Sequence, residues 1–239
     1  MTIISASETI DDFAAFGIRA FTTGRATGSF GLASDEPTGL VMRRWAMLRE
    51  ELQPGGARLA TATQVHGTRV VVHGCDWEGW LRVDAADGHV GPARGLALAV
   101  TIADCVPVFI GHPSGAVALL HSGWRGTAAR IVERGIQALA HSGFVPRELR
   151  VHLGPAICGK CYEVGVDVLR ELSRRDSSGS GHVDLREMIA AHAHEAGVRH
   201  ITTSPLCTRC DNDRLFSHRG GDAGRQVAVI MADSLARAV

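Results

Sequence analysis

The sequence lacks an excess of charge of either sign, because its 25 lysine and arginine residues equal its 25 aspartate and glutamate residues. A balanced chain has no strong field toward nucleic acid or an anionic membrane, so neither partner is expected. It also lacks the ~20 consecutive apolar residues that span a bilayer. Its first residues have neither the basic start nor the long apolar run of a secretory signal. We therefore expect a cytoplasmic protein that binds a small molecule.

Cysteine is scarce as well, with six in 239 residues. This is too few for a disulfide scaffold, so we expect reduced thiols that serve metal binding or nucleophilic chemistry. Hydrophobic residues make up 45% of the chain and charged residues 21%, which excludes the composition of a disordered protein. We expect one domain over residues 1–239, and a monomer.

Short apolar runs separated by glycine, aspartate and proline predict strands at 17–22, 58–63, 68–72, 88–90, 96–101, 106–110, 116–120, 149–153 and 227–231. Several runs are apolar throughout, which is typical of strands buried on both faces, so we expect a central sheet covered by other layers.

Apolar residues at helical spacing predict helices over 126–140, near 164–174 and over 185–196. A further helix buries Val41, Trp45, Leu48 and Leu52 and ends at the Pro-Gly-Gly string of residues 54–56. The polar segment 23–37 before it is expected to be a loop outside the core. Strands and helices together indicate an α/β fold.

Three strings place a metal-binding type of side chain at the end of an expected strand. They are TQVHG at 63–67, TIADCVPV at 101–108 and HSGWRG at 121–126, with His66, Cys105 and His121. Strand ends followed by glycine-rich loops are where α/β folds hold reactive groups, so the three could converge. Two imidazoles and one thiolate form a catalytic zinc set whose open position takes water or substrate, and zinc lowers the pKa of that water to ~7. The alternative is a buried cysteine with two hydrogen-bonded loop histidines.

Charged residues next to these strings are further candidates. Arg125, at an expected helix start, suits a phosphate or carboxylate, although a solvated arginine is the alternative. Asp104 precedes Cys105, and Asp87 lies in a carboxylate-rich turn. Either could orient a histidine or act as a general base, while turn formation is the alternative for Asp87.

Two Cys-x-x-Cys pairs, Cys158 with Cys161 and Cys207 with Cys210, resemble the ligands of a structural zinc site. Their separation along the chain is longer than the usual ~15–20 residues. We therefore expect ordinary loop cysteines near the pocket rather than a compact metal site.

Five strings in fixed order resemble the laccase-domain family, also labelled multicopper polyphenol oxidase, purine nucleoside phosphorylase or peptidoglycan editing factor. They are TQVHG, DG before TIADCVPV, HSGWRG, GPAICGKCYEVG, and CTRC followed by FSHRGGDAGR, within about residues 21–230. The resemblance implies metal ligands at His66, Cys105 and His121, with zinc as the metal and copper as the alternative. It also implies one α/β domain of four layers, α-β-β-α, with mixed sheets, related to cysteine-hydrolase toxins.

The resemblance further implies phosphorolysis of adenosine, inosine, guanosine and S-methyl-5'-thioadenosine, with adenosine deamination as a side activity. The expected partners are a purine nucleoside and phosphate. Arg125 or Arg25 would bind phosphate, and the Gln64 amide a purine edge or a ribose hydroxyl. Leaving-group stabilisation and placement of phosphate would supply most of the catalysis.

Three other functions remain open at this stage. A copper-dependent polyphenol oxidase needs many histidines in paired motifs, whereas one triad is visible. A hydrolase that edits a peptidoglycan precursor amide would use Cys105 as nucleophile and His121 as base. A non-enzymatic binding protein would retain a structural metal. Metal content and turnover separate these functions.

Overall fold

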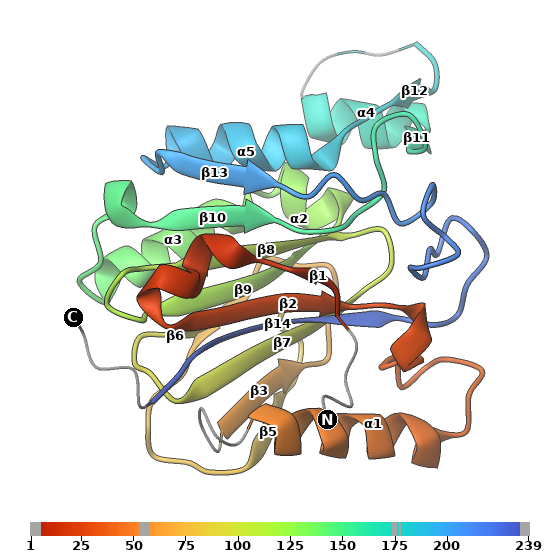
Figure 1. The fold of residues 1–239 in the computed structure, drawn as a ribbon. Coiled ribbons are helices and arrows are strands. Elements are labelled where there is room, and N and C mark those ends of the chain that lie inside the picture. Colours follow the sequence, from red (N-terminus) through yellow and green to blue (C-terminus); the bar gives the residue numbers. More distant parts are fainter. Residues whose placement is uncertain (1–5, 53–57, 174–175, 177, 235–239) are drawn as a thin grey trace.

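Two mixed six-stranded sheets form the centre of the computed structural model, which describes residues 6–52, 58–173, 176 and 178–234 (Figure 1). The first sheet has the order β1 (Ala6–Thr9), β2 (Ile18–Thr23), β14 (Gln226–Ala232), β7 (Leu96–Ile102), β3 (Arg58–Ala62), β5 (Trp80–Val83). Strand β7 pairs antiparallel with β14 and parallel with β3. The parallel pairing brings the carboxyl ends of β3 and β7 to one end of the sheet.

The second sheet has the order β13 (His200–Thr203), β10 (Arg150–Leu153), β8 (Val106–Gly111), β9 (Val117–Ser122), β6 (Gly88–Gly91), β4 (Val70–Val72). Strands β8 and β9 are antiparallel neighbours, while β10 and β13 run parallel. A separate antiparallel pair is formed by β11 (Glu163–Val164) and β12 (Gly181–His182).

The core forms between the sheets because their central strands are apolar on both faces. On β7, Leu98 and Val100 face the second sheet, whereas Ala97 and Ala99 face the helical side. Each large aliphatic side chain buried in this way contributes about 1.5–3 kcal/mol. The predicted covering of a central sheet by other layers is confirmed.

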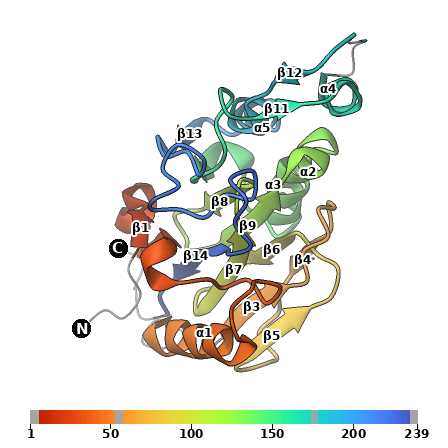
Figure 2. The ribbon, with the colours of Figure 1, turned by 90° about the vertical axis from the view of Figure 1, so that its right-hand side faces the viewer.

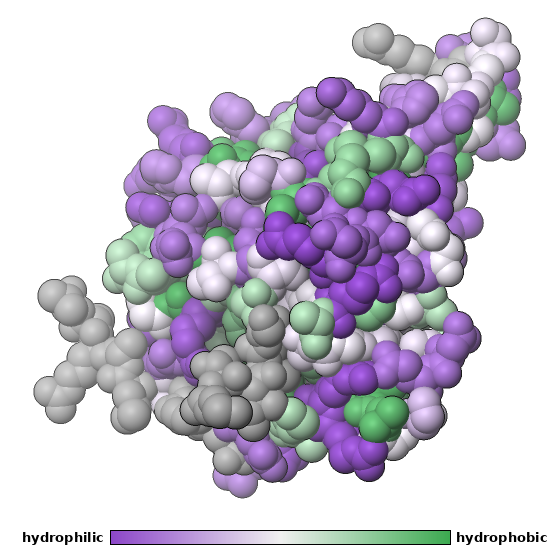
Figure 3. Space-filling model, turned by 45° about the vertical axis from the view of Figure 1, so that its right-hand side comes forward, coloured by the Kyte–Doolittle hydropathy of each residue, from purple (hydrophilic) through white to green (hydrophobic). Residues whose placement is uncertain are grey.

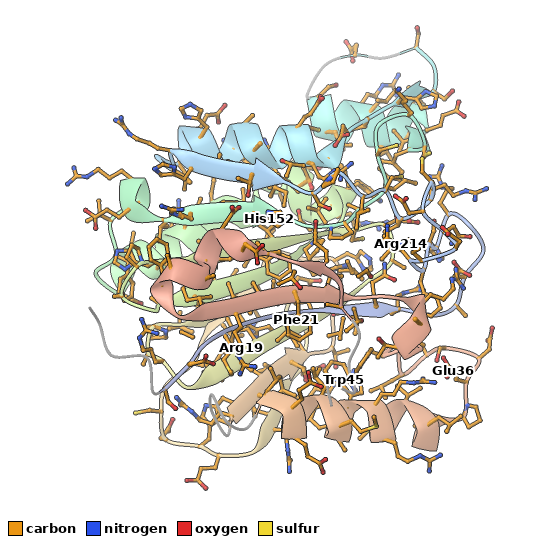
Figure 4. All side chains as sticks on the ribbon, in the orientation of Figure 1. Arg19, Phe21, Glu36, Trp45, His152 and Arg214 are labelled. Atoms are coloured by element: carbon orange, nitrogen blue, oxygen red, sulfur yellow. The ribbon has the colours of Figure 1, made fainter. Side chains whose placement is uncertain are left out.

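Helices cover the two outer faces (Figures 1 and 2). Helix α1 (Thr38–Leu52) packs on the first sheet, and its Trp45 lies between the helix and the sheet (Figure 4). Trp45 stacks on Trp80 with ring centroids 5.2 Å apart. Helices α3 (Ile131–His141) and α5 (Leu185–Glu195) pack on the second sheet. In the described part of the chain, the other helices are α2 (Trp124–Ala128), α4 (Val166–Ser173) and the 3₁₀ turns Asp11–Phe16, Arg25–Thr27 and Pro146–Glu148.

Three edge strands, β1, β5 and β13, were not predicted from the sequence. They lie at the margins of the sheets, and most of their side chains are exposed or half-buried. An edge strand has no continuous apolar pattern because it packs against fewer neighbours. Strands β1 and β13 are also mostly polar and so resemble loops, whereas β5, with three apolar residues of four, is too short for a recognisable strand pattern.

The predicted helix over 126–140 is wrong in its continuity, because the chain forms α2 and α3 with a break between them. Arg130 has a φ of 60°, which ends the α-helical path. Its guanidinium pairs with Glu133 at 2.5 Å and with Glu195 of α5. Because of this break, α3 packs on the second sheet, while the first residues of α2 stay at the end of the sheet where β9 ends.

The segment 23–37 is also less peripheral than predicted. Phe30 is 1% exposed and packs edge-on against Trp45. The indole Nε1 of Trp45 donates to the Phe30 carbonyl oxygen at 3.0 Å. The expected stop at residues 54–56 and the end of the expected helix at residue 174 lie outside the described residues.

Hydrophobic residues occur as small separate patches among hydrophilic ones on the face shown in Figure 3. No helix in the described part of the chain is both long enough and apolar enough to cross a bilayer.

Candidate active site

Strand order brings three distant residues together. His66 follows β3, Cys105 lies in the turn between β7 and β8, and His121 lies near the end of β9. The parallel strands β3 and β7 end at the same side, β8 starts there, and its antiparallel neighbour β9 returns to it. The three side chains therefore meet at one end of the paired sheets.

The ligand atoms of His66, Cys105 and His121 all lie within 4.8 Å of one another. His121 is 4% exposed, whereas His66 is open to solvent. Gly123 leaves room for the group, since a Cβ atom there would lie 2.9 Å from Cys105 Sγ and 3.1 Å from His66 Cδ2. We call these three residues the His-Cys-His cluster.

Asp87 holds this cluster in place from a fully buried position. Its Oδ1 accepts hydrogen bonds from His121 Nδ1 and from the backbone N–H of His66, both at 2.9 Å. Its Oδ2 accepts from the backbone N–H of Gly67 at 2.7 Å and of Val65 at 3.2 Å. Since Nδ1 of His121 donates to the carboxylate, its Nε2 is left for a metal or a thiolate. The sequence-based expectation that an aspartate orients a histidine agrees with this geometry at Asp87.

Neighbouring charges set the protonation of the cluster. Burial raises the pKa of the Cys105 thiol, but the imidazoles of His121 and His66 outweigh it and lower the pKa from 9.0 to about 6. Burial lowers the pKa of His121, but the Cys105 thiolate and the Asp87 carboxylate raise it from 6.5 to about 9. At neutral pH without a metal, the pair is therefore thiolate and imidazolium.

The donor set fits zinc, which binds imidazole nitrogen and thiolate sulfur in tetrahedral geometry. A carboxylate that accepts from the second nitrogen of a ligating histidine is the usual support of such a site, and Asp87 supplies it. A dication at the cluster would replace the proton that His121 and Cys105 otherwise share. The His-Cys-His cluster can therefore hold a metal ion such as zinc.

A cavity of about 670 Å³ opens beside the cluster, a size typical of small-molecule sites. It is lined by Ala33, Gln64, His66, Thr101, Ala103, Asp104, Cys105, His121, Gly123, Trp124, Arg125, Ile157, Tyr162, Leu185, His218, Arg219 and Arg225. Arg125 Cζ lies 4.3 Å from the centroid of the Trp124 ring.

Two other residues singled out from the sequence, Gln64 and Arg25, are held by internal contacts. The Gln64 amide, which lines the cavity, donates to the Thr101 carbonyl and accepts from the Thr101 backbone N–H, both at 2.8 Å. Arg25 is not among the cavity-lining residues, and its guanidinium pairs with Asp222 at 2.7 Å. Gln64 thus lies at the cavity, whereas Arg25 lies outside its lining.

Asp104 has a φ of 82°, an uncommon conformation that needs support from neighbouring groups. Its carboxylate accepts from Thr208 Oγ1 at 2.6 Å, Ser217 Oγ at 2.8 Å and the Arg219 backbone N–H at 2.6 Å. These contacts tie the C-terminal loop to the turn that carries Cys105.

Two cavity residues, Tyr162 and His218, were not proposed from the sequence. Burial raises the pKa of Tyr162, which keeps its hydroxyl protonated. Arg219 Cζ lies 5.2 Å from the Tyr162 ring centroid and so links the two loops. Both residues lie in strings that carry the resemblance to the laccase-domain family, GPAICGKCYEVG for Tyr162 and FSHRGGDAGR for His218.

A second group of metal-binding side chains lies in loops next to the cavity. The Sγ atoms of Cys158, Cys161, Cys207 and Cys210 all lie within 4.8 Å of one another. We call them the four-cysteine cluster. The expectation that the two pairs stay apart is wrong, because the strands before them, β10 and β13, are parallel neighbours whose ends lie side by side. This cluster can also hold a metal ion such as zinc.

Comparison with known proteins agrees with the resemblance seen in the motifs. Residues 23–233 match the family described as multi-copper polyphenol oxidoreductase laccase. A purine nucleoside phosphorylase of Streptomyces coelicolor is 33% identical over 211 residues, which cover 85% of this chain and 86% of that protein. An adenosine deaminase from an unknown prokaryotic organism is 33% identical over 159 residues, 60% of this chain and 61% of that protein.

Among solved structures, the hypothetical protein YfiH of Bacillus licheniformis superposes with a TM-score of 0.86 at 25% identity. The superposition covers 94% of this chain and 96% of that chain. The motifs, the matched length and the fold agree. The chain therefore belongs to the laccase-domain family, which is described as multi-copper polyphenol oxidoreductase laccase.

Proposed function

We propose that this protein is a zinc-dependent purine nucleoside phosphorylase acting on adenosine, inosine, guanosine and S-methyl-5'-thioadenosine, with adenosine deaminase activity at the same site. The observation that carries the proposal is the convergence of the His-Cys-His cluster on a cavity of about 670 Å³ that also receives Arg125. The names of the relatives from Streptomyces coelicolor and from the unknown prokaryote support both reactions.

Zinc held by the cluster would act as a Lewis acid beside the substrate. The chain's own contribution is orientation, because Asp87 fixes the His121 ring and the backbone of the loop that carries His66. Asp104 acts as a positioning residue, since it joins the Cys105 turn to the loop of His218 and Arg219. These contacts hold the reacting groups at fixed positions, which lowers the entropic part of the barrier.

Arg125 is assigned to phosphate binding because no acceptor that the structure describes neutralises its guanidinium. Within the described residues its guanidinium lies over Trp124 and makes no hydrogen bond or ion pair. Arg219 donates to the Glu163 carbonyl at 2.8 Å, and Arg225 Nη1 donates to three successive carbonyls of its own loop. Arg25 pairs with Asp222, so it is assigned to the support of the C-terminal loop and not to phosphate binding.

The purine is assigned to the side of the cavity that carries Gln64 and the aromatic rings of Trp124 and Tyr162. One N–H of the Gln64 amide is used by Thr101, so the other is held in a fixed direction for a purine or ribose acceptor. In phosphorolysis a phosphate oxygen bonds to C1' as the bond from C1' to N9 breaks, and the purine takes up a proton. In deamination water adds at C6 and ammonia leaves.

The test is a chromatographic assay of adenosine with and without phosphate, alongside zinc and copper analysis of the protein. We expect adenine and ribose 1-phosphate only with phosphate, inosine in both conditions, and loss of both reactions in Cys105→Ala together with the metal of this cluster. Cys75→Ser, which removes an exposed cysteine outside both clusters, is the matched control. The same assay is run with inosine, guanosine and S-methyl-5'-thioadenosine, and zinc-loaded protein that leaves all four nucleosides unchanged would refute the proposal.

One observation favours a second candidate, a Cys-His amide hydrolase. Without metal, the Cys105 thiolate, the His121 imidazolium and Asp87 form a nucleophile, acid and orienting carboxylate. The thiolate would attack an amide carbonyl, such as that of a peptidoglycan precursor, and His121 would protonate the leaving amine before water cleaves the thioester. Mass spectrometry of the metal-free protein with such an amide would detect the acyl-enzyme, and its absence would exclude this candidate.

A further inference from the structure

The four-cysteine cluster is built by two similar turns. One Cys-x-x-Cys turn follows β10 and the other follows β13, and the parallel pairing of these strands continues as a bridge between Ala156 and Cys207. Each turn is closed locally, by the Cys161 backbone N–H donating to the Cys158 carbonyl at 2.9 Å and by the Cys210 N–H donating to Cys207 Sγ at 3.4 Å. Two short loops thus present four thiols to one point.

The spacing of the sulfur atoms is close to that of a tetrahedral zinc site. With Zn–S bonds of ~2.3 Å, the sulfur atoms of such a site lie ~3.8 Å apart. Here the Sγ atoms of Cys161 and Cys210 are 3.5 Å apart, and all four lie within 4.8 Å. Side-chain shifts of about 1 Å would complete the tetrahedron without movement of the strands.

The surroundings suit the negative charge of a zinc ion bound to four thiolates. Cys207 Sγ accepts backbone N–H groups from Cys158 at 3.3 Å and from Cys210 at 3.4 Å. Each turn also carries a basic residue between its cysteines, Lys160 in one and Arg209 in the other. The backbone N–H groups therefore stabilise negative charge on Cys207 Sγ, and the two basic residues lie on the same turns.

We propose that the four-cysteine cluster is a structural zinc site, separate from the His-Cys-His cluster. When zinc binds, each cysteine that is still a thiol releases its proton to solvent, and each thiolate binds directly. No electron is transferred. Four protein ligands leave no position for a substrate, which is typical of a structural rather than a catalytic zinc.

The proposed ion joins two loops that form one wall of the cavity. The first loop carries Ile157 and Tyr162, which line the cavity on either side of Cys158 and Cys161. The second carries Thr208, whose hydroxyl donates to Asp104 at 2.6 Å. Zinc would hold these loops together and so keep the cavity wall and the Cys105 turn in register.

The first experiment leaves the four-cysteine cluster intact and removes the other site. Cys105→Ala and, separately, His66→Ala are purified with zinc and a reductant, and their metal content and zinc X-ray absorption spectra are measured. We expect about one zinc per chain in each variant, against two in the wild type and in Cys75→Ser, with four sulfur ligands at ~2.3 Å. Variants without zinc, or zinc with nitrogen or oxygen ligands, would overturn the proposal.

The second experiment removes the cluster. Cys161→Ala with Cys210→Ala should lose one zinc per chain and lower Tm, while the zinc bound by the His-Cys-His cluster remains. A thiol titration of the denatured wild type, with and without prior reduction, tests the competing disulfide. A metal-free cluster whose thiols appear only after reduction would show a disulfide and contradict the zinc assignment. Because both readouts are independent of nucleoside turnover, they stand apart from the proposed activity.

Discussion

Replacing Asp87 with asparagine measures how much the buried carboxylate contributes to the metal site. An asparagine keeps the shape of the side chain but replaces one oxygen with an NH₂ group. Whichever way the amide turns, this NH₂ faces two N–H donors: those of His121 and His66 on one side, or those of Gly67 and Val65 on the other. Two of the four hydrogen bonds are lost, and two donors are left unsatisfied.

The expected effect has two parts. Hydrogen bonds to a charged group contribute about 1.5–3 kcal/mol each, so the free energy of unfolding should fall by about 3 kcal/mol or more. Loss of the carboxylate behind a ligating histidine typically weakens metal binding about 10–100-fold, which is about 1.4–2.7 kcal/mol. The zinc affinity of the folded variant should fall within this range.

Competition with a chromophoric zinc chelator at pH 7.5 measures the affinity, and urea denaturation measures the stability. Asp84→Asn is the matched control, because the Asp84 side chain is exposed and its backbone carbonyl is the group that Arg69 contacts at 2.7 Å. A folded Asp87→Asn variant with wild-type zinc affinity would refute the role given to Asp87. An equal loss in Asp84→Asn would show that the effect is not specific to the site.

Arg125→Ala should raise the KM for phosphate about tenfold or more, because a charged hydrogen bond of about 1.5–3 kcal/mol is lost. Arg125→Lys should retain part of the affinity. An unchanged KM in Arg125→Ala would show that Arg125 does not bind phosphate. Gly123→Ala should reduce the zinc occupancy of the His-Cys-His cluster, because the added Cβ atom would lie 2.9 Å from Cys105 Sγ. A wild-type zinc content in elemental analysis would contradict this prediction. Burial lowers the pKa of His73 from 6.5 to about 4 and of His89 from 6.5 to about 3. The unfolded chain therefore binds protons first, and the free energy of unfolding should fall as the pH drops from about 6.5 toward 4. Replacing both histidines with leucine should flatten this slope in urea titrations, and an unchanged slope would refute it.

The central strands could be predicted from the sequence because their burial is visible in the local pattern. Strand β7 is apolar at successive positions, so its sequence predicts that it is covered on both faces, and both faces of β7 are indeed packed in the core. Edge strand β13 has no such pattern, and β5, at four residues, is too short to show one. The break at Arg130 was also invisible, since neither glycine nor proline marks it and ion pairs with Glu133 and Glu195 accompany it.

The sequence by itself determined the residue types of the site, since motif strings singled out His66, Cys105 and His121 as potential ligands. Only the tertiary structure decided which residues meet. It selected Asp87 as the carboxylate that orients His121, directed Asp104 to the C-terminal loop, and joined two cysteine pairs expected to stay apart. The physical reason is that sequence patterns report burial and turns over a few residues, whereas strand order and direction set which loops emerge side by side.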